Sequence, residues 1–120
     1  MPALNNVHLI GNLGRDPETR YTPTGKKVCH FTLAVSRRSS DEADWFYIEA
    51  WERLGEICQQ YLTKGRLVYI GGRLKTERWQ DDKGETRHST RVVARQMQML
   101  DRKPEEPEVT AEAGETEEAE

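Results

Sequence analysis

The stretch from Ala43 to Lys64 constrains the fold more than any other, because it starts with the alternation of a β-strand and continues with the spacing of a helix. Successive strand side chains point to opposite faces. One face carries small or apolar side chains suited to a core: Phe46, Ile48 and Ala50. The other carries three aromatic rings and one acid: Trp45, Tyr47, Glu49 and Trp51. Since the first face already supplies a core, we expect the outward rings to serve a function.

The second half of this stretch predicts an amphipathic helix. Its apolar residues follow the spacing i, i+3, i+4, i+7 and i+8 of a single stripe: Leu54, Ile57, Cys58, Tyr61 and Leu62. Gly65 is expected to end the helix as a C-terminal glycine, with Lys64 close to the negative end of the helix dipole. The start is weakly marked, because no Ser, Thr, Asp or Asn cap precedes it and Gly55 costs about 1 kcal/mol relative to Ala.

Alternation and a high content of β-branched and aromatic residues predict the other strands: Val7–Leu13, Thr19–Thr22, Lys27–Ser36, Arg66–Gln80 and Glu85–Ala94. Residues 96–100 either close the sheet or form a short terminal segment. Gly11 and Gly14 are expected to bend the first strand, as at the corner of a barrel. A hairpin turn with a glycine is predicted at 81–84.

The order of strands with one helix between the third and fourth of them is that of the all-β OB-fold, a five-stranded, partly open barrel that binds oligonucleotides on one face. Periodicity alone supports only a small β-barrel with one helix, and the position of the helix favours the OB-fold. We expect this domain over residues 1–103. Residues 104–120 hold mainly Pro, Glu, Ala and Thr, which predicts a disordered acidic C-terminal tail.

Charge is unevenly distributed along the chain. The net charge is −3, with 18 basic and 21 acidic residues. Residues 104–120 hold eight of those acids and no Lys or Arg, so residues 1–103 hold 18 basic and 13 acidic residues, a net charge of +5. A basic body with an acidic tail indicates a polyanionic partner for the body.

The sequence does not show the clustered side chains that a catalytic or metal site requires. Cys29 and Cys58 lie far apart, and His8, His30 and His88 are scattered, whereas a metal site needs clustered ligands. We therefore expect no metal, no cofactor and no catalytic residue. No apolar run approaches the ~18 residues of a membrane span, so we expect a cytoplasmic protein with reduced thiols and no membrane contact.

Binding of unpaired nucleic acid requires flat aromatic surfaces for the bases and cations along the phosphates. Trp45, Trp51 and Trp79 are the predicted stacking surfaces, and Trp79 shares a strand face with Arg73 and Lys75. The candidate cations around them are Arg15, Arg20, Arg53, Lys64, Arg66, Arg73, Lys75, Arg78 and Arg87. Each stack contributes roughly 1–3 kcal/mol, so the tryptophans rank above any single cation. Taken one at a time, each tryptophan is equally well explained by a core or a subunit contact, and most cations by a solvated surface.

The sequence resembles the bacterial single-stranded DNA-binding protein family over nearly all of residues 5–100. The matching motifs are Asn12-Leu13-Gly14-Arg15-Asp16-Pro17-Glu18, Arg20-Tyr21, Phe31-Thr32-Leu33-Ala34, Asp44-Trp45, Tyr61-Leu62-Thr63-Lys64-Gly65, Val68-Tyr69-Ile70, Leu74-Lys75-Thr76, Trp79 and Met97-Gln98-Met99-Leu100. The resemblance implies an OB-fold homotetramer that wraps single-stranded DNA, coats exposed strands in replication, recombination and repair, and is associated with the nucleoid.

The resemblance also implies roles for individual residues. It implies base stacking at the three tryptophans and DNA contacts from Arg20, Arg53, Lys64, Lys75 and Arg78, with Phe46 near the subunit interface. Three positions depart from the family pattern: Ser39 where some members carry a further tryptophan, Glu77 where a basic residue is usual, and a chain end of Glu117-Glu118-Ala119-Glu120 without the Pro-Phe tip that docks replication and repair enzymes.

Three other interpretations stay open on the residues alone. The first is a primosome-type OB accessory protein or an RNA chaperone. The second is a nuclease or deaminase, which has little support because no carboxylates or His and Cys ligands cluster near the aromatic face. The third is an interaction scaffold whose tryptophans form a protein interface.

Overall fold

Five long strands form the frame of the structure. The computed structural model describes residues 2–101 and 109–110. The elements in chain order are β1 (Val7–Leu13), β2 (Glu18–Tyr21), β3 (Lys27–Ser36), β4 (Ala43–Trp51), α1 (Glu52–Tyr61), β5 (Leu67–Gln80), β6 (Thr86–Met99) and β7 (Val109–Thr110). The rest of the predicted tail and its acidic chain end lie outside the described residues.

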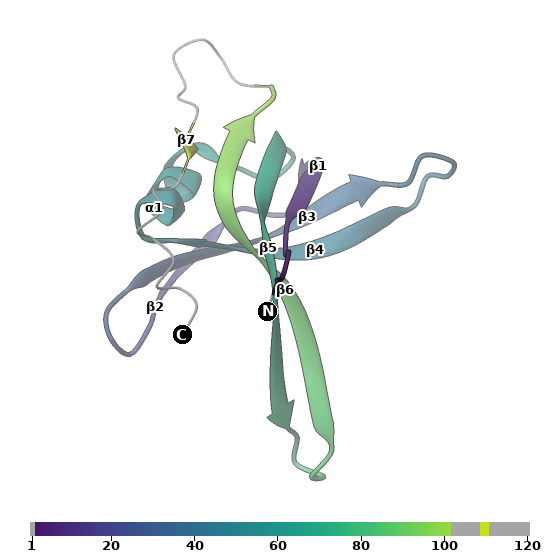
Figure 1. Cartoon of the computed structure of the whole chain (residues 1–120). Coiled ribbons are helices and arrows are strands. Elements are labelled where there is room, and N and C mark those ends of the chain that lie inside the picture. The colour runs from purple at the N-terminus through teal and green to yellow at the C-terminus, as the bar shows by residue number, and fades with distance from the viewer. Residues whose placement is uncertain (1, 102–108, 111–120) are drawn as a thin grey trace.

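The five long strands close into a ring. Neighbours follow the order β1-β5-β6-β4-β3, and β1 also pairs with β3 through Asn12–Ala34 and Leu13–Leu33, which completes the circle. All of these pairs are antiparallel except β4 with β6, which run parallel at Ile48–Val92 and Glu49–Val93. β2 extends the sheet beyond β3 (Figure 1). The predicted five-stranded barrel with one helix is confirmed.

Residues 96–100, for which the sequence left two outcomes open, largely continue β6. The pairing of β5 with β6 passes from Gly71–Gln96 to Gly72–Ala94, so Arg95 is an extra residue on β6. Such a bulge bends a strand and increases its twist. It lies within the barrel part of the β5–β6 ladder, because Val92 and Val93 on its hairpin side still pair with β4; the ladder beyond them projects as a hairpin arm (Figure 1).

The core lies inside the ring, and α1 covers one end of it (Figure 1). The strands contribute most of its completely buried side chains: Phe31, Leu33, Ile48, Val68, Ile70, Val92, Met97 and Met99. Leu54 and Cys58 of α1 and Leu62 just after it are also buried, while Ile57 and Tyr61 pack partly against the core. The predicted apolar stripe of the helix is therefore confirmed, since each of its five members faces the barrel.

The predicted role of Gly65 as the glycine that ends the helix is wrong. α1 ends at Tyr61, and Leu62 is the C-cap, with its N–H donating to Cys58. Gly65 does have a positive φ of 91°, but it lies in a separate turn that is tied to the first strand. There the N–H of Gly65 donates to the Leu13 carbonyl at 2.9 Å, and the N–H of Lys64 donates to the Asp16 carboxylate at 2.8 Å.

Candidate nucleic-acid interface

Two of the three predicted stacking residues, Trp45 and Trp79, are exposed. Trp45 on β4 is 62% exposed, and Trp79 on the β5–β6 arm is 50% exposed. Trp45 lies directly over Gly14, where a Cβ atom would come within 2.5 Å of the indole Cζ3 atom. Both indoles therefore present a flat apolar surface on the outside of the barrel, where a base could stack.

Trp51, the third predicted stacking residue, is only partly exposed and borders a hollow. It is the last residue of β4, and the hollow beside it has a volume of about 430 Å³. The remaining lining residues come from the turn between β2 and β3: Thr22, Pro23, Thr24 and Lys26. A second hollow of about 520 Å³ lies on the hairpin arm and is lined by Glu77, Arg78, Trp79 and Arg91. Two of the three tryptophans thus form walls of open hollows.

Glu49 is a buried acid on the aromatic face of β4. Its neighbours in register are His30 on β3 and Val93 on β6, so it sits in the middle of the sheet and is 2% exposed. Its carboxylate accepts hydrogen bonds from Arg91 Nη1 at 2.7 Å, Lys75 Nζ at 3.1 Å and Trp51 Nε1 at 3.2 Å. Burial alone raises the pKa of Glu49, but these hydrogen bonds and the positive charges outweigh it, and the pKa lies below its usual value.

His30 is buried against the same group of rings. Its imidazole meets Tyr47 edge to face, with ring centroids 5.5 Å apart, while the Arg91 guanidinium lies 4.8 Å from the Tyr47 centroid. Burial lowers the pKa of His30, with Glu49 opposing that effect and Arg20 and Arg91 adding to it. Within the described residues, His30 Nδ1 has no hydrogen-bond partner. Burial therefore favours the neutral form of the imidazole over the charged one.

The predicted cations differ in how far their charge is available. Arg15, Arg53, Lys64 and Arg78 are exposed, and Arg20 is exposed with a contact to Glu18 at 3.4 Å. Arg73 and Lys75 are half-buried, and the Lys75 side chain is only 14% exposed because Glu49 holds it. Arg87 is paired with Asp81 at 2.9 Å.

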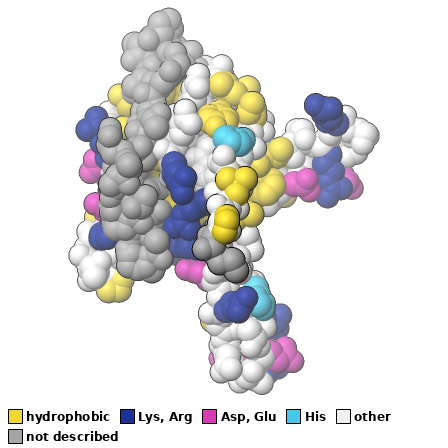
Figure 2. Space-filling model, viewed as in Figure 1, with side chains coloured by type: hydrophobic (Ala, Val, Ile, Leu, Met, Phe, Trp, Pro, Cys, Tyr) yellow, Lys and Arg dark blue, Asp and Glu magenta, His cyan; other side chains and the backbone are white. Residues whose placement is uncertain are grey.

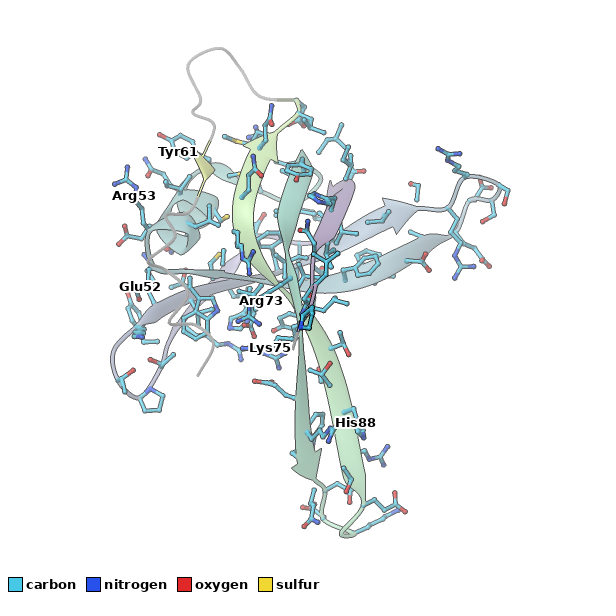
Figure 3. The ribbon with its side chains drawn as sticks, in the orientation of Figure 1. Glu52, Arg53, Tyr61, Arg73, Lys75 and His88 are labelled. Carbon is cyan, nitrogen blue, oxygen red and sulfur yellow. The ribbon has the colours of Figure 1, made fainter. Side chains whose placement is uncertain are left out.

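The cations are also spread in space. Figure 3 shows Arg73 and Lys75 near one another where the strands cross, with Arg53 pointing outward from α1 at the edge of the molecule. Figure 2 shows Lys and Arg side chains near hydrophobic ones in the middle of the molecule, with more along the two projecting arms. The structure therefore brings Lys75 to Trp51, with Lys75 Nζ 5.6 Å from the ring centroid, but leaves Arg53 apart from that pair.

Sequence reasoning missed Glu49 and Arg91 as members of this site. The only available signal was that Glu49 stands between two tryptophans in the alternation of β4. Arg91 joins it only through the parallel pairing of β4 with β6, which the sequence does not reveal. In the described ranges, the structure has no group of three or more His, Cys, Asp or Glu side chains that could hold a metal ion, and no helix long and apolar enough to cross a membrane.

A five-stranded barrel with exposed indoles, flanking cations and one capping helix defines the OB class of oligonucleotide-binding barrels. The chain belongs to the Single-strand binding protein family, whose model matches residues 4–100. The predicted OB-fold and the predicted family are thereby confirmed.

Curated relatives agree with this assignment. "Single-stranded DNA-binding protein 1" of Chlorobaculum tepidum is 48% identical over 106 residues, covering 82% of this chain and 65% of that protein. "Single-stranded DNA-binding protein" of Thermotoga maritima is 45% identical over 113 residues, covering 88% and 80%. "Single-stranded DNA-binding protein 1" of Synechocystis is 44% identical over 94 residues, covering 76% and 78%. The matched part of this chain thus spans just under two thirds of the Chlorobaculum protein. The names describe DNA-binding proteins and not enzymes.

Proposed function

We propose that this chain binds single-stranded DNA without reading its sequence, by stacking bases on Trp45, Trp51 and Trp79 and by neutralising phosphates with nearby cations. The observation that carries this proposal is the exposure of Trp45 and Trp79 on a barrel of this family. Stacking tolerates any base, because every base has a π-face. Such binding would protect exposed strands in DNA replication, recombination and repair.

The cations supply the part of binding that salt weakens. Arg15, Arg20, Lys64 and Arg78 are exposed among the predicted phosphate contacts, and so is Arg53 on α1. Each phosphate neutralised on a single strand contributes about −0.7 to the slope of log K against log salt. Lys75 and Arg73 are less accessible, so we expect them to contribute less than the exposed cations.

We also propose a homotetramer. Residues 7–11 of β1 pair with β5 on one side, and in the described part of the chain their other edge has no strand partner. Ile10 on this strand is 54% exposed. An unpaired edge with an exposed apolar residue favours strand addition or packing by a second copy. Replication and repair enzymes are proposed as partners of the acidic tail, and the nucleoid as the location.

Titration of intrinsic tryptophan fluorescence with oligonucleotides tests the proposal. We expect oligo-dT to quench the fluorescence strongly and to bind well ahead of both oligo-U and duplex DNA, with an affinity that falls as salt rises. Duplex DNA bound as tightly as oligo-dT would contradict it, and preference for oligo-U would favour an RNA chaperone. Sedimentation with and without oligo-dT tests the tetramer.

A further inference from the structure

One carboxylate joins three strands on the aromatic face. Glu49 of β4 uses both oxygens: Oε1 accepts from Trp51 Nε1 and from Lys75 Nζ of β5, while Oε2 accepts from Arg91 Nη1 of β6. The Glu49 side chain is 3% exposed, and those of Lys75 and Arg91 are 14% and 27% exposed. Hydrogen bonds to a charged, poorly solvated acceptor are stronger than neutral ones, so these three donors are held firmly.

The hydrogen bonds fix the orientation of the Trp51 ring. An indole has one N–H, so its bond to Glu49 sets which edge of the ring points into the sheet. Lys75 Nζ then lies 5.6 Å from the centroid of the same ring, a cation–π distance. The ring is therefore held at its N–H edge and accompanied by a cation.

Beside this fixed ring lies the hollow of about 430 Å³ that the turn between β2 and β3 completes. Hydrogen bonds within the turn shape it: the Thr22 hydroxyl bonds to the Thr24 hydroxyl at 3.0 Å and accepts the N–H of Lys26 at 3.0 Å. The volume falls in the range of small-molecule pockets, roughly 300–1,000 Å³. A hollow of this size that is lined by an indole and by the turn suits one flat aromatic ligand.

We propose that Glu49 is a positioning residue that holds the Trp51 indole as one wall of a slot for a single nucleobase, with the turn at 22–26 as the other wall. This inference rests on the proposed function. In this proposal the main role of Lys75 is to support the Trp51 ring, and contact with a phosphate is secondary.

A simpler account makes the opposite prediction. If Glu49 only neutralises Lys75 and Arg91, removing its charge frees two cations and tightens DNA binding. If Glu49 positions Trp51, removing its charge loosens the indole and weakens stacking. Glu77 offers a matched control, because its carboxylate contacts the same two cations, at 3.9 Å from Lys75 and 3.7 Å from Arg91, from an exposed position on β5.

The experiment uses the double variant W45F/W79F, in which Trp51 alone remains of the chain's three tryptophans. In this background E49Q leaves one carbonyl oxygen for three donors. We expect lower fluorescence anisotropy of Trp51 and faster acrylamide quenching without DNA, and about three- to tenfold weaker binding of oligo-dT, a fraction of a full stack. E77Q should leave Trp51 anisotropy unchanged and should not weaken binding.

A double-mutant cycle that combines E49Q with W51F gives an independent measurement. W51F keeps a ring but lacks the N–H, so E49Q should have little further effect on the binding of fluorescein-labelled oligo-dT in that background. If E49Q does not fold, hydrogen exchange with Glu49 intact tests the same contact. In W45F/W79F the indole N–H of Trp51 should be strongly protected from exchange with solvent. Trp51 anisotropy equal in E49Q and its parent, tighter binding in E49Q, or an indole N–H that exchanges as in free indole would overturn the proposal.

Failure of the proposed function would look different. In that case oligo-dT would not quench Trp51 even in W45F/W79F with Glu49 intact. The anisotropy and hydrogen-exchange measurements need no DNA and would still decide whether Glu49 positions Trp51.

Discussion

The backbone at the junction between β4 and α1 is expected to lower the stability of the fold, because one residue there has an unfavourable φ. Glu52, directly after Trp51 and labelled at the start of α1 in Figure 3, has a φ of 54°. It is the one non-glycine residue with a positive φ in the described part of the chain. For an L-residue this conformation costs about 1–2 kcal/mol. Its carboxylate recovers part of that cost by accepting the N–H of Lys27 at 3.2 Å.

Comparing E52G with E52A isolates the strain, because both variants lose the hydrogen bond and the acid. Glycine relieves the strain of about 1–2 kcal/mol but loses about 0.5–1 kcal/mol in chain entropy relative to alanine. We expect E52G to be more stable than E52A by about 0.75 kcal/mol, the difference between the midpoints of those ranges. That corresponds to roughly 3 °C in melting temperature for a chain of this size.

Glu56 on the exposed side of the same helix provides the control. Its backbone is ordinary helix, so E56G should be less stable than E56A by about 1 kcal/mol. The assay is thermal and urea unfolding of all four variants at one protein concentration, because an oligomer's stability depends on concentration. If E52A equals or exceeds E52G in stability, the positive φ stores no strain and the reasoning is wrong.

Three further predictions follow from the site. W51A should weaken oligo-dT binding by about 1–3 kcal/mol, the value of one stack, and by more than R87A does in the same fluorescence titration; equal losses would refute the ranking. G14V should displace the Trp45 ring, so its oligo-dT affinity should fall toward that of W45A; native affinity in G14V would show that the ring does not depend on this contact. The lowered pKa of His30 means that the unfolded chain binds a proton more readily, so stability should fall as pH drops from the ordinary value of 6.5 through the lowered value; urea unfolding should show a flatter profile over that range in H30Q, and an unchanged slope would contradict the assignment.

Much of the frame follows from local patterns. The alternation of β4 correctly separated Ile48 and Ala50 from Trp45, because side chains of a strand must alternate between faces whatever the strand packs against. The apolar stripe of α1 was equally decisive, since only one face of a surface helix can reach the core. These properties depend on neighbours in the chain, so the sequence is sufficient to predict them.

Contacts between side chains on different strands of the barrel could not be predicted from the sequence. The sequence predicts Lys75 as a phosphate contact, and only the structure shows that β5 also brings it to Glu49. Arg91 reaches the same carboxylate from 42 residues away along the chain. Gly65 has the positive φ of a C-terminal glycine, but in a separate turn that β1 holds and not at the end of α1. Glu52 has a positive φ that local propensity does not predict, with its carboxylate hydrogen-bonded to Lys27 of β3. Which charges neutralise each other and which ring is held depends on strand register. Register is set by the closure of the whole barrel, and only the tertiary structure shows it.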